Sequence, residues 1–144
     1  MKLLLPSQNY VLLRRFSAKE ERRRLTASCF IGALQAGLYV ALENHLNYVY
    51  HPARPLSLDE TYGLAALFNS ALLDRYFRTI SGNTQVNATE LRTMPLPTLK
   101  AIAAIGRRVQ SLSILRGDSV EQIVLDSVGI NGSLGQYLME AAGE

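Results

Sequence analysis

The hydrophobic pattern of this chain has a period of two residues in its first third and a helical period further on. A β-favouring run covers residues 9–16, and apolar positions alternate with polar ones over residues 24–31. The alternation places Leu25, Ala27, Cys29 and Ile31 on one side and Arg22, Arg24, Thr26 and Ser28 on the other. It predicts a strand whose opening carries several guanidinium groups on one exposed edge. Residues 38–50, after a turn bracketed by two glycines, predict one or two further strands.

The helical part of the pattern begins after a proline-containing loop at residues 51–55. Ser57 and Glu60 have the S-x-x-E spacing of a capping box, which predicts that a helix begins at Leu58. Asn69 and Ser70 interrupt the helical period, so we expect two short helices instead of one long helix.

Capping signals also divide the rest of the chain into elements. Asn87 and Glu90 repeat the capping spacing over one turn, and Thr98 caps a helix that Gly117 stops. A further helix runs from Asp118 to Gly129, and a final short helix carries Leu134, Tyr137, Leu138 and Ala141. Strands first and helices later predict an α+β fold, with a mixed or antiparallel sheet at the N-terminus and a helical C-terminus. We expect a β-rich domain over residues 1–97, with a helical pair at 58–80, and helices of residues 98–144 packed on the same domain.

Composition places the chain among single globular domains. Its 144 residues are 48% hydrophobic and 19% charged, which suits a packed core and not a disordered tail. No apolar run approaches the roughly 18 residues of a membrane span, so we expect no membrane partner. The single cysteine, Cys29, cannot form an internal disulfide and lies on an apolar alternation. These features indicate a cytoplasmic protein with a buried thiol.

No catalytic centre is predicted from the residues of this chain. His45 and His51 have no partner at metal-ligand spacing, so no metal site is expected. The sequence has no phosphate-binding glycine loop, no dinucleotide-binding turn and no nucleophile elbow. The carboxylates of Asp59, Glu60, Glu90, Asp118 and Glu121 stand at predicted helix N-termini, where negative charge is stabilising without any catalytic role.

The positive charge is concentrated in residues 14–24, which we call the basic segment. It holds six basic and two acidic side chains, a net charge of +4, whereas the whole chain carries +3. A concentrated patch suits a polyanion, because arginine forks onto phosphate oxygens and releases counterions. The candidate phosphate contacts are Arg14, Arg15, Lys19, Arg22, Arg23 and Arg24. The alternative is a solvated hairpin with ordinary surface charge, and Arg75 and Arg78 either extend the patch or are plain surface charge.

Two polar stretches carry side chains that can read base edges. The first, residues 81–87, is the polar loop, and its candidates are Asn83, Thr84, Gln85 and Asn87. The second is a polar-aromatic stretch whose candidates are Asn44, His45 and Asn47. Amide side chains match adenine in a bidentate way, and tyrosines beside them suit unpaired bases. The alternatives are that Asn87 only caps a helical turn and that Tyr48 and Tyr50 are core residues.

Four stretches together resemble a known family. They are R-R-F-S-A-K-E-E-R-R-R-L at 14–25, L-E-N-H-L-N-Y at 42–48, L-F-N-S-A-L-L-D-R-Y-F-R at 67–78 and S-G-N-T-Q-V-N-A-T-E-L-R at 81–92. In order and spacing they resemble the C-terminal region of bacterial adenine-N6 DNA methyltransferases of the restriction-modification type. The resemblance covers residues 9–108. Residues 69–108 are also similar to target-recognition domains of type I specificity subunits.

The resemblance implies a division of labour between two domains. In such enzymes an upstream domain binds S-adenosylmethionine and carries an N-P-P-[YF] motif, which this chain lacks. We therefore expect a non-catalytic piece of a larger protein, with double-stranded DNA and the catalytic domain of the same protein as partners. Residues after Arg116 receive no role. Two alternatives remain open: a protein-interaction module that docks through the helices after Leu99, or a domain that binds single strands or RNA.

Overall fold

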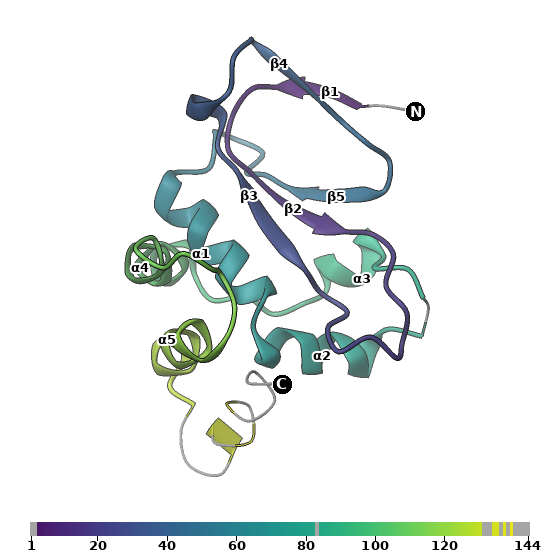
Figure 1. Cartoon of the computed structure of the whole chain (residues 1–144), viewed down its shortest axis with the longest axis vertical. Coiled ribbons are helices and arrows are strands. Elements are labelled where there is room, and N and C mark those ends of the chain that lie inside the picture. Colours follow the sequence, from purple (N-terminus) through teal and green to yellow (C-terminus); the bar gives the residue numbers. More distant parts are fainter. Residues whose placement is uncertain (1–2, 83, 131–133, 136, 138, 140–144) are drawn as a thin grey trace.

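The strands form two small antiparallel sheets. The computed structural model describes residues 3–82, 84–130, 134, 135, 137 and 139. Strands β1 (Leu3–Pro6) and β4 (Tyr39–Leu42) pair as a separate ribbon at the top of Figure 1. Strand β2 (Tyr10–Arg14) lies between β3 (Ala27–Phe30) and β5 (Leu46–Val49) in a three-stranded sheet. The helices follow the strands, so the predicted α+β fold is confirmed.

One face of the three-stranded sheet packs against the helices. Val11, Leu13 and Ala27 are buried in the core, and α1 (Leu58–Phe68) contacts both β2 and β3. The period-two pattern of residues 24–31 thus correctly predicts which side of β3 is inside.

The second predicted strand is shorter than expected, since β3 begins at Ala27 and not at residue 24. Helix side chains replace the strand ladder here. The Asp74 carboxylate accepts the backbone N–H groups of Arg24 and Leu25, at 2.7 and 3.0 Å. Asn69 accepts from the N–H of Ala27 and donates to its carbonyl, at 2.8 and 2.9 Å.

The predicted helix starts are confirmed at four positions. Ser57 and Glu60 form the full capping box of α1, and Ser70 caps α2 (Ala71–Ile80). Thr98 caps α4 (Leu99–Val109), and the short α3 (Ala88–Arg92) begins after Asn87. The break at residues 69–70 lies where the sequence predicts it.

The C-terminal helices pack on the first part of the chain. Helix α4 crosses α1 at two glycines, since a Cβ at Gly63 would lie 1.9 Å from the Ile102 carbonyl oxygen and one at Gly106 1.7 Å from that of Asp59. Helix α5 (Asp118–Val128) contacts α4 and α1, and Gly129 ends it in the left-handed region.

One expectation for this part needs correction. Helix α4 ends at Val109 and does not continue to Gly117, because the chain turns there with Leu112 N–H bonded to the Val109 carbonyl. Glu121 lies in the first turn of α5, as expected. Its buried carboxylate also accepts the N–H groups of Ala71 and Leu72, at 2.7 and 3.3 Å, and so caps α2. Leu138 and Ala141 of the expected final helix lie outside the described residues. Within the described part of the chain, none of the helices has the length and apolar character needed to cross a membrane.

Candidate nucleic-acid interface

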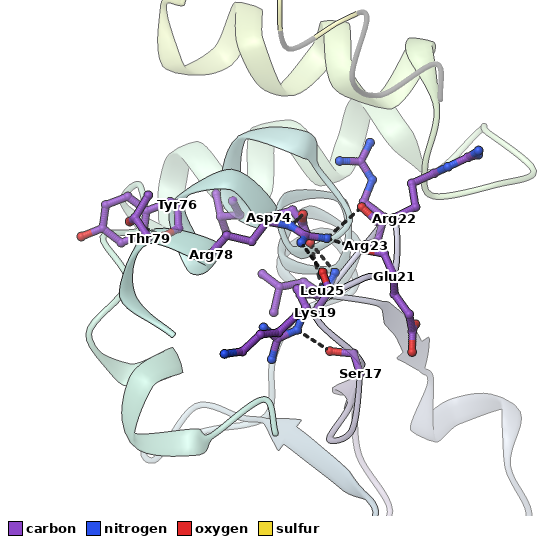
Figure 2. A network of polar contacts seen from close by, with 12 residues as sticks. Ser17, Lys19, Glu21, Arg22, Arg23, Leu25, Asp74, Tyr76, Arg78 and Thr79 are labelled. Atoms are coloured by element: carbon purple, nitrogen blue, oxygen red, sulfur yellow. Dashed lines mark hydrogen bonds and ion pairs between the residues drawn. The ribbon is translucent and has the colours of Figure 1, made fainter. Parts of the chain in front are cut away.

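The backbone of the basic segment is held by one side chain of α2. Arg78 donates to the carbonyl oxygens of Lys19 at 3.0 Å, of Arg22 at 3.1 Å and of Glu21 (Figure 2). Its Nε also donates to Asp74 Oδ2 at 2.9 Å. These hydrogen bonds fix the backbone carbonyl groups of Lys19, Glu21 and Arg22 in position. Because the guanidinium of Arg78 is hydrogen-bonded to those carbonyls, Arg78 does not extend the basic segment as a cation available to a ligand.

Arg24 lies inside the protein, which corrects the expectation of an exposed side chain. Only 2% of the residue is accessible, its Nε donates to Ser17 Oγ at 2.8 Å, and its guanidinium lies 5.4 Å from the centre of the Phe77 ring. The buried hydroxyl and the ring replace the water that an arginine normally keeps. Because β3 starts after this residue, strand alternation does not govern its direction. Arg24 supports the basic segment from within.

The remaining cations of the basic segment differ in their availability. Lys19 and Arg22 are exposed, and Arg15 and Arg23 are half-buried. Arg14 is exposed but forms an ion pair with Glu21, whose carboxylate also accepts from the Ala18 N–H at 3.1 Å. The backbone hydrogen bond from Ala18, followed by the hydrogen bond from Arg14, lowers the pKa of Glu21. Arg14 is thus partly neutralised by its own segment.

The polar loop lies directly against the basic segment. Phe16 and Gln85 form an antiparallel β-bridge, with Ser17 N–H donating to the Thr84 carbonyl at 3.2 Å. The Val86 N–H donates in turn to the Arg15 carbonyl at 2.6 Å. These backbone bonds hold two segments that are far apart in the sequence side by side.

The polar-aromatic stretch borders the same surface. The Arg15 N–H donates to the His45 carbonyl at 3.0 Å, and its Nη1 donates to the Asn44 carbonyl at 2.9 Å. The rings of Phe16 and His45 meet at 5.8 Å between centroids. Asn47 Nδ2 donates to the Val86 carbonyl at 2.7 Å, which fixes the polar loop to the end of β5.

The residues predicted to contact base edges fall into two groups. Thr84, Gln85, Asn44 and His45 are exposed. Asn87 accepts from the Thr89 N–H at 2.7 Å and so caps α3, in line with the alternative role stated for it. Asn47 is a positioning residue through its bond to the polar loop. Asn83 lies outside the described residues.

Sequence reasoning did not single out Asp74, and it named Arg78 only as a possible extension of the patch or as surface charge. Asp74 is 1% exposed, and with Arg78 it forms an i,i+4 pair on α2. The spacing of an acid four positions before an arginine was a visible signal for that pair. It gave no indication that both side chains would turn toward a loop 49 to 59 positions earlier in the chain.

Two observations concern reactive side chains among the described residues. In the part of the chain that the structure describes, no group of three or more His, Cys, Asp or Glu side chains could hold a metal ion. Burial raises the pKa of Cys29 to about 11, and its Sγ lies 3.7 Å from the Thr61 carbonyl oxygen. The thiol therefore stays protonated at neutral pH and is a poor nucleophile.

Comparison with known proteins gives this surface a context. The chain is 39% identical over 126 residues to the type II methyltransferase M.BsuBI of Bacillus subtilis. This chain is similar to type II methyltransferases. A second relative, M.PstI of Providencia stuartii, is 38% identical over 132 residues. The matches cover 88% and 92% of this chain but 24% and 25% of the relatives, so the chain spans about a quarter of their length. No protein-family model matches the chain, and no solved structure matches it.

Proposed function

We propose that this chain is the DNA target-recognition part of a restriction-modification adenine-N6 DNA methyltransferase. It works with a catalytic domain that binds S-adenosylmethionine and is not part of this chain. The relatives named type II methyltransferase support the methyltransferase setting, since the chain matches them over most of its own length. The parts that we propose are the role in target recognition, the binding of duplex DNA and the division of the enzyme into two domains.

The observation that carries this proposal is the β-bridge between Phe16 and Gln85. It brings exposed amide and hydroxyl side chains beside a cationic loop. Phosphate contacts fix register and orientation, and side chains at base edges supply sequence preference. Lys19 and Arg22 are the exposed cations for phosphate, and Thr84 and Gln85 are the adjoining groups for base edges. One continuous surface thus supplies both kinds of contact.

The salt dependence of duplex binding tests the electrostatic half of the proposal. Each phosphate contact contributes roughly −0.9 to the slope of log affinity against log salt. With four or so cations of the basic segment engaged, the slope for the 144-residue chain is about −4. Replacing both Lys19 and Arg22 by alanine should reduce its magnitude by about 2.

A matched variant separates local contact from net charge. Replacing Lys100 and Arg116 by alanine removes the same charge from exposed positions on α4 and in the loop after it. This control should keep the slope of the unchanged chain. Equal effects of the two double variants, or a slope near zero for the unchanged chain, would contradict the proposed function and favour a protein-interaction module.

A further inference from the structure

The outer face of the three-stranded sheet carries a cluster of aromatic rings. Tyr10 meets Tyr48 edge-on at 5.8 Å and Phe30 at 6.3 Å between ring centroids. Tyr48 and Tyr50 are stacked, with centroids 5.5 Å apart and ring planes inclined by 27°. The network of ring contacts therefore runs across all three strands and continues into the residue after β5.

The strand register explains why these rings face away from the helices. Val11 and Leu13 point into the core, so Tyr10 and Leu12 point to the opposite face. Tyr48 pairs with Leu12 and therefore lies on that outer face. Tyr50 follows at the same parity and is 52% exposed. The tyrosines are thus not all core residues, contrary to one interpretation of the sequence.

A cleft of about 500 Å³ opens beside these rings. Its walls are the tyrosines of the cluster, the end of β1, Gln8 and the proline-containing loop at residues 51–55. The volume falls in the range of small-molecule sites, which run from roughly 300 to 1,000 Å³.

Polar groups at the cleft are held in place by the loop and by α1. His51 Nδ1 accepts from the Ala53 N–H at 3.1 Å, so Nε2 carries the proton of the neutral ring. The Arg54 guanidinium is bound by both carboxylate oxygens of Glu60, at 2.7 and 2.8 Å. Gln8 adds an amide that can both donate and accept. Tyr10 is 2% exposed, so the rings open to the cleft are those of the half-buried Tyr48 and the exposed Tyr50, and they lie beside positioned hydrogen-bonding groups.

We propose that this tyrosine cleft binds an unpaired nucleobase of DNA. A base offers a flat π-surface for Tyr48 and Tyr50 and edge groups for Gln8 and His51, which matches the chemistry of the walls. An aliphatic ligand would leave the polar groups of the loop unmatched. The inference rests on the proposed function for its ligand, since β5 links the cleft to the interface through Asn47. It adds a place for a base that has left the duplex.

Titration of the full chain with deoxyadenosine monophosphate tests the cleft without a duplex. We expect the ring NMR resonances of Tyr48 and Tyr50 to shift on addition of the nucleotide, with those of Tyr76 unchanged. Tyr76 lies on α2 and is 41% exposed, which makes it the matched tyrosine. Tyr50→Ala should weaken binding about tenfold, because stacking on one ring is lost. Tyr50→Phe keeps the ring and should stay within about twofold, as should Tyr76→Ala.

The possible outcomes distinguish a failure of the cleft assignment from a failure of the proposed function. Absence of shifts at Tyr48 and Tyr50, or equal shifts at Tyr76, overturns the cleft assignment even where salt-dependent duplex binding is intact. Shifts confined to Tyr48 and Tyr50 and lost in Tyr50→Ala support it. That result stands even where the chain shows no duplex binding, in which case only the proposed recognition role fails.

Discussion

Arg78 and Asp74 form a partly buried ion pair on one face of α2, with Nε 2.9 Å from Oδ2. The side chain of Asp74 is 1% exposed and that of Arg78 is 26% exposed. Each member of the pair also binds the basic segment, Asp74 through two N–H groups and Arg78 through three carbonyl oxygens. The two side chains together satisfy both kinds of backbone group in a loop that has no ladder of its own.

Replacing Arg78 by alanine should lower the free energy of unfolding by about 3 kcal/mol, because it leaves a buried carboxylate without its partner. Urea unfolding of both proteins measures the difference. Arg107→Ala is the matched control, since Arg107 also pairs with an aspartate but is 60% exposed. The control should cost less than about 1 kcal/mol. Similar losses in both variants would mean that the pair does not organise the loop.

The helix starts and the end of α5 could be predicted because their signals are local. Ser57, Thr98 and Gly129 act on backbone groups within one turn, so their spacing is sufficient. The direction of the Arg24 side chain could not be predicted in this way. Its environment comes from Ser17 and from Phe77 of a later helix, and strand alternation carries no information about either.

The same limit of local sequence signals applies to the candidate interface. Composition and motif predict that the basic segment and the polar loop are exposed, and their role in recognition remains a prediction. They do not indicate that Phe16 pairs with Gln85, because that contact depends on how the sheet and α2 place two distant loops. The tyrosine cleft likewise depends on register, since a shift of one residue would turn Tyr48 into the core.

Gln85→Ala should change the preference among DNA sequences while leaving the phosphate contacts in place. A bidentate amide contact discriminates between bases by roughly 1–3 kcal/mol, so its loss should flatten preference at one position. Selection of bound duplexes from a random pool, with the unchanged chain and the variant side by side, measures this. Lys19→Ala is the comparison, and it should weaken binding to all sequences alike. If Gln85→Ala selects the same duplexes as the unchanged chain, Gln85 does not contribute to the preference among DNA sequences.

Glu60 should make the fold sensitive to acid. The hydrogen bond from Arg54, assisted by those from Ser57, lowers the pKa of Glu60 from 4.5 to about 2. A carboxyl whose folded pKa lies below its unfolded pKa stabilises the fold above the unfolded value and loses that effect as pH falls through the folded value. Unfolding free energy should therefore drop as pH falls from about 4.5 to 2.

Glu60→Gln isolates that contribution from the other carboxylates. Because Arg54 is partly exposed, we expect about 2 kcal/mol of the pH-dependent loss to disappear in the variant. Denaturant titrations at several pH values between 5 and 2, on both proteins, give the comparison. Parallel curves for the two proteins would show that Glu60 has an ordinary pKa in the folded chain.

Gly106→Ala tests whether the contact of α4 with α1 is as close as the structure has it. An added Cβ would lie 1.7 Å from the Asp59 carbonyl oxygen, so one helix must move away from the other. We expect a loss of about 3 kcal/mol or more in unfolding free energy, because backbone cannot yield as a flexible side chain does. Gly82→Ala serves as the control, since its Cβ would meet nothing within 4 Å, and it should change stability by less than about 0.5 kcal/mol. A small effect at Gly106 would mean that the helices are further apart, and the C-terminal helices would then be only loosely joined to the sheet and the candidate interface.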